Sequence, residues 1–468
     1  MTSKVRTEKD SLGTRQIPES VYYGIQTDRA IENFPISGLR AHPRFIDAFL
    51  YIKKAAALAN CKAGVLPKNL ADALAKACDE VLAGSLRDQF PLDVYQMGAG
   101  TAFNMNVNEV IANRANEILG GQRGAYIPVH PNDHANMGQS TNDVFPTAAR
   151  LGLLIILKEY LHGPLEELEK AFAAKGKEFD GVLKSARTHL QDAVPIRLGQ
   201  EFAAYGAAIK KCRLSLLEAE KSLRELGIGG SAAGTGLNTA PGYREEVIKE
   251  LERLTGFKVV PAADMREAMQ SQRPLAEVSA ALRNLSLEIT RIVNDLRLMA
   301  SGPTTGFGEI DLPAIAPGSS IMPGKVNPSI LEMTNMVAFQ VLGIDTTVAF
   351  AVQAGQLELN VMMPLMAFNL NLAATILGNA LRILREKCVE GITANKERCR
   401  HYAESSMGLA TALNPFIGYA KAAEVAKEAH ASGKTIIQVI RERKILSDEE
   451  IKRVMDPFKM TEPGIPGK

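Results

Sequence analysis

Two long runs of apolar residues constrain the fold of this chain more than any other feature of its sequence. The first extends from Leu198 to Leu226 and the second from Leu275 to Met299, with apolar or small residues alternately three and four positions apart. This heptad spacing places the apolar side chains along one stripe of a helix. Because a globular helix averages about 11–12 residues, two helices of this length predict a bundle of parallel and antiparallel rods.

Other segments support a mainly α fold built on a central bundle of long helices. The aromatic share is 6%, Trp is absent, and long stretches lack Gly and Pro. Helices are also expected at Phe45 to Gly64, Leu70 to Ala83, Asn142 to Tyr160, Glu166 to Phe179, Ser329 to Val352 and Met362 to Glu390. Extra apolar residues such as Leu287 and Val293 flank the stripes. Helices that are apolar on several faces need several neighbours, so we expect assembly into a multi-subunit helical core.

The chain is long enough for several domains, and its composition changes twice along its length. Residues 1–142 are mixed, with an irregular start, and predict a mainly helical N-terminal domain. Residues 143–394 hold the long apolar helices and predict the central bundle. Residues 395–468 are more charged, with shorter helical segments, and predict a small helical C-terminal domain.

Charge and targeting signals exclude several partners. Lys and Arg number 54 against 52 Asp and Glu, so the net charge of +2 supplies no basic field for nucleic acid. The segment from Val361 to Leu381 is uncharged and approaches the length of a membrane span, but its Pro364 and three Asn residues favour a helix buried in protein. The N-terminus lacks an apolar signal segment. We therefore expect a cytoplasmic protein without a membrane partner.

Four short stretches combine hydroxyls, amides and glycines in a way that packing does not require. They are Gly98 to Asn106, Gly138 to Asp143, Arg187 to Asp192 and Gly318 to Pro328. The first stands ahead of a helix expected to begin near Val107, and the third places Thr188 and His189 immediately before the first long helix. Any one alone is more often a set of helix caps or a loop. Together their hydroxyls, amides and helix-start N–H groups suit anions, and Lys325 adds a positive charge. The set predicts a site for a small dicarboxylate.

Motifs for cofactor chemistry are missing from the sequence. It contains no strand-borne glycine fingerprint, Walker loop or HExxH motif. Its five cysteines are widely spaced, without a CxxC pair or a nearby His at zinc-ligand spacing. We therefore expect reduced thiols, no metal and no cofactor.

The same four stretches carry a resemblance to a known family. The loop GSSIMPGKVNP, from Gly318 to Pro328, is similar to the signature of the aspartase/fumarase superfamily. GAGTAFNMNVNEV, QSTND and RTHLQDAVP resemble the other conserved regions of that superfamily, in the expected order. The similarity runs from about Arg6 to the C-terminus. It implies a cofactor-independent elimination in a homotetramer whose active sites are each assembled from three subunits.

The resemblance also implies roles for individual residues. Ser319 would be the general base that removes a proton beside the distal carboxylate, helped by backbone N–H groups from Ser320 to Met322 and by Lys325. An anti elimination through an aci-carboxylate intermediate would follow. His189 and Lys325 are the other catalytic residues that the resemblance implies. The residues that match the family's substrate-binding positions are Thr101, Ser140 and Thr141 for the aci-carboxylate, Thr188, His189, Lys325 and Asn327 for the other carboxylate, Asn142 with Thr101 for the ammonium, and Ser320.

Two branches of the superfamily remain open, and they differ in the leaving group. The Tyr22 to Gln26 opening, Thr141 within QSTND and Ala354 to Asn360 resemble aspartases, which convert L-aspartate to fumarate and ammonia. The VHPND stretch around His130 resembles fumarases, which dehydrate malate, although a Pro-Asn-Asp turn also has a structural interpretation. The balance favours the ammonia-lyase.

Some features depart from that pattern. Ala102 stands where aspartases commonly carry Ser, and Met363 stands where many carry Glu. A third interpretation is a non-catalytic structural protein, because a helical bundle of this superfamily has been reused in the eye lens. Retention of Ser319, Lys325 and His189 together disfavours it.

Overall fold

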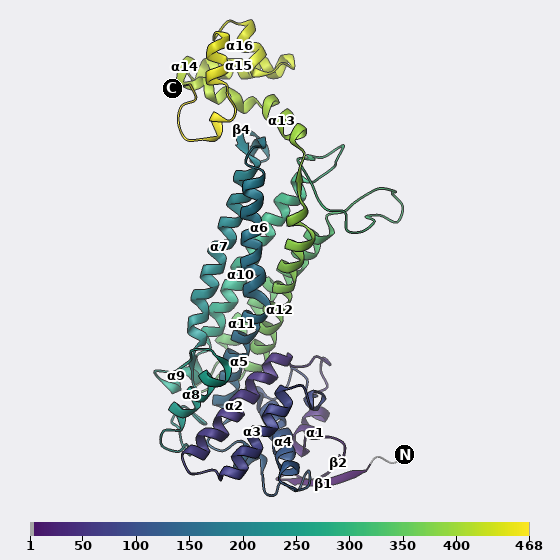
Figure 1. The fold of residues 1–468 in the computed structure, drawn as a ribbon, viewed down its shortest axis with the longest axis vertical. Helices are drawn as coiled ribbons and strands as arrows, with labels where there is room; N and C mark the ends of the chain where they lie inside the picture. Colours follow the sequence, from purple (N-terminus) through teal and green to yellow (C-terminus); the bar gives the residue numbers. More distant parts are fainter. Residues whose placement is uncertain (1–3, 468) are drawn as a thin grey trace. The chain divides into compact units, whose positions relative to one another are not determined.

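A computed structural model describes residues 4–467 of the chain and confirms a mainly α fold (Figure 1). Within these residues, strands occur only in two-stranded sheets. Two of the sheets are antiparallel hairpins, β1 (Val5–Asp10) with β2 (Gly13–Pro18) and β3 (Leu183–Thr188) with β4 (Gln191–Arg197). The other two join short pairs, β5 (Glu225–Leu226) with β6 (Val260–Pro261) and β7 (Ile310–Asp311) with β8 (Thr393–Ala394).

Four helices of 25 residues or more dominate the fold, as the two heptad runs predict. They are α7 (Leu198–Leu223), α10 (Arg273–Met299), α11 (Ser329–Gln353) and α12 (Met363–Lys387). The second predicted stripe is buried at each of its eight positions, from Leu275 to Met299. The first is buried except at Cys212 and Ala219, which are half-buried. The spacing of the apolar residues therefore identified the buried faces correctly.

Shorter helices fill the rest of the chain. The N-terminal part contains α1 (Ile25–Asn33), α2 (Pro43–Lys62), α3 (Lys68–Leu82), α4 (Thr101–Ile118) and α5 (Thr141–Ile156). A π-helical turn, Leu157–Leu161, separates α5 from α6 (His162–Glu178). Next come α8 (Tyr243–Thr255), α9 (Met265–Gln270), α13 (Lys396–Ser405), α14 (Asn414–Ile417), α15 (Tyr419–Ser432), α16 (Ile436–Glu442) and α17 (Asp448–Val454).

The contacts divide the chain into two compact units, each formed from three segments. Unit 1 comprises Met1–His162, Leu214–Asn284 and Phe339–Leu377. Unit 2 comprises Gly163–Arg213, Leu285–Ala338 and Gly378–Lys468. The three-part division expected from composition stays a prediction.

An aromatic cluster fixes two helix starts in unit 1. The ring centroid of Phe45 on α2 lies 5.5 Å from that of Phe103 on α4 and 5.3 Å from that of Phe145 on α5. Phe103 follows the first residue of α4, Thr101, by two positions, and Phe145 follows the first residue of α5, Thr141, by four. Because buried rings pack in a few discrete geometries, this cluster fixes where both helices begin.

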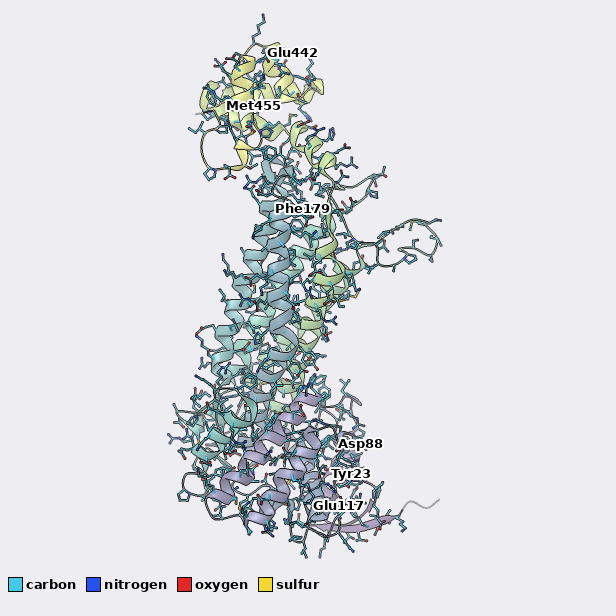
Figure 2. The ribbon with its side chains drawn as sticks, viewed as in Figure 1. Tyr23, Asp88, Glu117, Phe179, Glu442 and Met455 are labelled. Atoms are coloured by element: carbon cyan, nitrogen blue, oxygen red, sulfur yellow. The ribbon has the colours of Figure 1, made fainter. Side chains whose placement is uncertain are left out.

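Unit 2 has a separate apolar core near the C-terminus. Val425 of α15, Ile440 of α16 and Val454 of α17 are buried together there. Figure 2 labels Glu442 and Met455 on this part of the chain. Met455 belongs to the core and is 3% exposed. The predicted small helical C-terminal segment therefore has its own buried contacts.

One long helix has an uncovered apolar face. On α11, Met336 is 69% exposed, Phe339 55% and Phe350 65%. Ser329–Gln353 and Met363–Gly391 are long and apolar enough to cross a membrane by length and composition, and 33% and 61% of their apolar windows are buried. The second is therefore mainly a core helix, whereas the first presents apolar surface that one chain leaves open.

Candidate active site

The residues predicted for the site fall into both compact units. Unit 1 holds Thr101, Ser140, Thr141 and Asn142, whereas unit 2 holds Thr188, His189, Ser319, Ser320, Lys325 and Asn327. Each group has its own local geometry.

Thr101 begins helix α4, six residues earlier than the start near Val107 that the sequence suggested. The glycines before it look like loop residues, but they shape the helix start. Gly100 has φ +83°, and a Cβ at this position would overlap the Phe145 ring. The absence of a side chain lets the backbone turn tightly against the aromatic cluster, so that Thr101 is the first residue of the helix, and Gln96 Oε1 accepts from the N–H of Phe103 in its first turn at 2.9 Å.

Ser140 caps helix α5 and is itself held by Asp143. Ser140 Oγ accepts a hydrogen bond from the Asn142 N–H at 3.2 Å, and the Ser140 N–H donates to Asp143 Oδ1 at 2.9 Å. This reciprocal pair is a capping box. The cap uses the acceptor capacity of Ser140, which leaves its O–H available as a donor to an anion.

Asn142 and Asp143 tie this helix start to a glycine-rich turn. Asp143 is buried, and its Oδ2 accepts from the N–H groups of Gly229 and Ser231, both at 3.0 Å. Asn142 donates its side-chain N–H to the Ala232 carbonyl at 2.8 Å. Burial raises the pKa of Asp143 to about 6. The stretch from Ser140 to Asp143 is therefore held rigidly from both sides.

A cavity of about 430 Å³ opens beside Thr101 in unit 1. Its walls include Thr101, Arg29, Asp10 and His130. His130 Nδ1 accepts from the N–H groups of Asn132 and Asp133, at 3.2 and 3.3 Å. His130 therefore caps its own turn, which fits the structural interpretation of the VHPND stretch.

Thr188 and His189 lie on a β-hairpin, not before a helix as the sequence suggested. β3 ends at Thr188, β4 begins at Gln191, and α7 starts only at Leu198. The two turn residues, His189 and Leu190, have φ of +55° and +58°. This two-residue turn requires φ above zero at both positions, where Asn and Gly are usual. His and Leu do not favour positive φ, so nothing in the sequence indicated the hairpin. A strained backbone at such residues is typical of functional positions.

A buried ion cluster at the base of this hairpin was missed by the sequence analysis. Arg187 donates to Glu309 Oε1 at 2.8 Å, and Lys184 Nζ lies 2.9 Å from Glu309 Oε2. Lys184 also pairs with Glu201 at 2.9 Å, and Glu309 is fully buried. In the sequence, the cluster is indicated only by the two basic residues Lys184 and Arg187 on the short strand β3. The cluster fixes the hairpin, and with it His189, to the segment that leads into β7.

The signature loop, Gly318 to Pro328, is held by hydrogen bonds within itself. The Gly318 N–H donates to the Lys325 carbonyl at 2.7 Å, and Asn327 Nδ2 donates to the Gly318 carbonyl at 2.5 Å. A Cβ at position 318 would overlap the Lys325 carbonyl, so glycine is required there. Ser319 Oγ accepts from the N–H groups of Ile321 and Met322, at 3.2 and 3.0 Å. Two N–H groups aimed at one hydroxyl oxygen stabilise negative charge on it.

The side chains of this loop are accessible. Ser319 and Asn327 are half-buried, while Ser320 and Lys325 are exposed. Lys325 and Asn327 also line a cavity of about 730 Å³ in unit 2, together with Arg297 and Glu332. Cationic and amide side chains at one cavity suit a carboxylate ligand.

The signature loop of unit 2 holds a serine whose oxygen receives two backbone N–H groups, with a lysine in the same loop, and unit 1 separately presents hydroxyls at two helix starts. The lyase family model matches residues 13–343, and the fumarase C C-terminus model matches residues 409–462. The chain therefore belongs to this lyase family, within the superfamily that its signature loop indicated.

Individual relatives are similar over their whole length. An aspartate ammonia-lyase from Bacillus subtilis is 48% identical over 99% of this chain and 97% of its own. An aspartate ammonia-lyase from Escherichia coli is 44% identical over 100% of this chain and 98% of its own. A crystal structure of a fumarate lyase/delta crystallin from Brucella melitensis bound to cobalt has a TM-score of 0.95 and 48% identity, covering 98% of this chain and 100% of that chain. A class II fumarase from Schistosoma mansoni has a TM-score of 0.95 at 37% identity, with the same coverage.

Proposed function

We propose that this chain is an aspartate ammonia-lyase, a carbon–nitrogen lyase that converts L-aspartate to fumarate and ammonia. The observation that carries the proposal is the signature loop, where two N–H groups meet Ser319 Oγ and Lys325 follows six residues later. Sequence identity of 44–48% with aspartate ammonia-lyases along the full chain supports the substrate. The cytoplasmic location and the absence of a cofactor and of a membrane or nucleic-acid partner belong to the same proposal.

Proton removal is the first step that the site must perform. Ser319 as an alkoxide takes the proton from the carbon beside the distal carboxylate. The N–H groups of Ile321 and Met322 stabilise the alkoxide, and Lys325 adds positive charge in the same loop. Serine needs this help because the pKa of an ordinary hydroxyl is far above neutral pH.

The proton abstraction loads two negative charges on one carboxylate, and the helix starts of unit 1 supply the donors for it. Thr101 and Thr141 are the first residues of α4 and α5, and Ser140 has its O–H available. Each preorganised donor of this kind lowers a barrier by about 2.7–4 kcal/mol.

The remaining residues hold the rest of the substrate. The other carboxylate is bound by Thr188, His189, Lys325 and Asn327, and Ser320 belongs to the same substrate-binding set. Asn142, with Thr101, borders the ammonium, and its amide oxygen can accept from the ammonium while its amide N–H stays on the Ala232 carbonyl. Ammonia then leaves without a proton donor, since the leaving nitrogen is already protonated.

A homotetramer with shared sites accounts for the distribution of these residues. The exposed face of α11, with Met336, Phe339 and Phe350, supplies apolar surface for a second copy. We infer that the unit 1 group of one subunit works with the unit 2 group of others.

Mixing two inactive variants tests this arrangement. Ser319→Ala and Thr141→Val remove groups from different units, and each alone should lower turnover by about 10²-fold or more. Coexpression restores about a quarter of wild-type activity if a site draws these two residues from different subunits, because random assembly then gives that share of intact sites. No recovery in mixed oligomers means that one chain supplies both residues.

Stoichiometry tests the reaction itself. With L-aspartate as the only substrate, the purified protein should release ammonia and fumarate in equal amounts. Ammonia without fumarate would show a different deamination chemistry.

Dehydration of malate is the second candidate function. It is favoured by the TM-score of 0.95 with a class II fumarase and by the VHPND stretch. Hydroxide, unlike ammonia, needs a proton donor when it leaves, so the same base alone is insufficient.

A further inference from the structure

A buried lysine in unit 1 has no role in the reaction described above. Lys53 lies on α2 and is 1% exposed. Its Nζ donates to Asn136 Oδ1 at 3.0 Å and to Gln139 Oε1 at 2.9 Å. Within residues 4–467, no ion pair joins Lys53 to a carboxylate. A buried ammonium held only by amide oxygens is costly, and such groups are typical of functional sites.

Asn136 connects this lysine to helix α4. Its Oδ1 also accepts from the side-chain N–H groups of Asn104 and Asn108, both at 3.1 Å. Asn104 lies on α4 three residues after Thr101, and both asparagines are buried. One amide oxygen therefore receives Lys53 and two side chains of the helix whose first residue is Thr101.

Gln139 connects the lysine to the start of α5. It directly precedes Ser140, and its carbonyl accepts from Asn136 Nδ2 at 3.1 Å. Its own amide donates to the carbonyls of Ala135 and Met137, both at 3.2 Å, which fixes the turn before Ser140. Lys53 is therefore connected through Asn136 to helix α4 and through Gln139 to the start of helix α5, the two helices whose first turns carry the hydroxyl donors.

We propose that Lys53 is a positioning residue for the elimination, which sets Thr101 relative to Ser140 and Thr141 and adds buried positive charge behind these donors. The inference rests on the proposed function and deepens it. A dianionic intermediate gains from charge behind its hydrogen-bond donors, whereas the substrate, with less charge on that carboxylate, gains less. Lys53 should therefore act mainly on kcat, with little effect on KM.

The charge of Lys53 changes within the range of an ordinary assay. Burial lowers its pKa to about 7, and the titratable groups that face it, Asp143 on α5 and Cys78 on α3, offset this only in part. Burial also raises the pKa of the Cys78 thiol to about 12, so that Asp143 is the relevant neighbour. As pH rises through about 7, Lys53 loses its charge, although the neutral amine can keep its hydrogen bonds.

Steady-state kinetics of Lys53→Met on the full-length oligomer test the inference, with Lys62→Met as the matched control. Lys62 ends the same helix and is 61% exposed in its ion pair with Glu246, so its removal should leave both constants unchanged. Lys53→Met should lower kcat for L-aspartate by about 10²-fold and change KM by less than about threefold. The wild-type to Met ratio of kcat should also fall as pH rises from about 6 to about 8, since only wild type has the Lys53 charge to lose, whereas Asp143 is present in both proteins.

A second variant covers the case in which Lys53→Met does not fold. Asn136→Asp keeps an acceptor for Lys53 and pairs the ammonium with a carboxylate, and it removes the N–H that Asn136 donates to the Gln139 carbonyl, so the same selective fall in kcat is expected. An unchanged kcat in either folded variant, a ratio independent of pH, or equal losses in kcat and oligomer content would overturn the inference. Wild-type protein in the same assay distinguishes failure of this inference from failure of the proposed function, because a wild-type protein that does not turn over L-aspartate would contradict the proposed function itself.

Discussion

The backbone N–H of Met322 donates to Ser319 Oγ at 3.0 Å, and the N–H of Ile321 reaches the same oxygen at 3.2 Å. This geometry resembles an oxyanion hole built around the enzyme's own side chain. It makes a serine hydroxyl a plausible base without a histidine beside it.

Replacing Ser319 with Ala should lower kcat for L-aspartate by about 10²–10⁴-fold, because general-base catalysis has this range. Thermal stability and oligomer size should stay unchanged, since the loop keeps its bonds from Gly318 to Lys325 and Asn327. Ser405→Ala, at an exposed position ending α13, is the control. Wild-type turnover by Ser319→Ala would remove Ser319 as the base.

Glu309→Gln should loosen the hairpin that presents His189. The buried Glu309 carboxylate pairs with both Lys184 and Arg187, and breaking a buried pair costs about 3–5 kcal/mol. We expect a matching loss in the free energy of unfolding and a raised KM for L-aspartate. Glu442→Gln breaks an exposed pair with Lys434 and should cost less than about 1 kcal/mol. Equal effects of the two variants in urea denaturation would refute a special role for the cluster.

Glu109 should make the stability of unit 1 depend on pH. Its carboxylate accepts from the N–H groups of Gly24 and Gln26, both at 2.8 Å, and from Thr27 Oγ1 at 2.6 Å, which caps helix α1. Glu109→Gln should therefore destabilise the protein by about 1–3 kcal/mol.

The pH dependence has a definite sign. Burial raises the pKa of Glu109 from 4.5 to about 7, although the Thr27 hydroxyl and the N–H groups of Gln26 and Gly24 oppose this. A raised pKa in the folded state means that the contribution to stability is complete below about 4.5 and is lost as pH rises through about 7. The stability difference between wild type and Glu109→Gln should shrink over that interval. A difference that grows with pH would mean that the hydrogen bonds outweigh burial.

Gly100→Ala should damage the site more than Gly64→Ala does. Gly100 and Gly64 both have positive φ, +83° and +77°, so alanine strains the backbone by about 1–2 kcal/mol at either position. Only at Gly100 would the added Cβ overlap a ring, that of Phe145, whereas nothing lies within 4 Å at Gly64. We expect Gly64→Ala to retain activity and Gly100→Ala to lose activity as well as a further 1–3 kcal/mol, about the cost of overpacking. Equal kinetics of the two variants would contradict the role of Gly100 in placing Thr101.

The sequence predicted the long helices well because their burial follows a simple period. From Leu275 to Met299 every third or fourth side chain is buried, which the spacing alone reveals. The start of α4 was misplaced because Gly98 and Gly100 look like loop residues, although Gly100 is there to let the chain turn against Phe145.

Candidate site residues could be named from the sequence, whereas their local geometry could not. The hairpin at His189 lacks the Asn or Gly that signals such a turn, and its strain becomes visible only in the backbone angles. The partners of Lys53 and Glu309 come from distant segments, so that no local pattern shows why these charges are buried.

Fumarate formation followed by ultraviolet absorbance, with L-aspartate and L-malate supplied separately to the purified protein, tests the central claim most directly. The account predicts turnover of L-aspartate, its loss in Ser319→Ala and little or no turnover of L-malate. Turnover of malate alone would make the chain a fumarase and contradict the ammonia-lyase assignment, while inactivity with both substrates would contradict the assigned chemistry altogether.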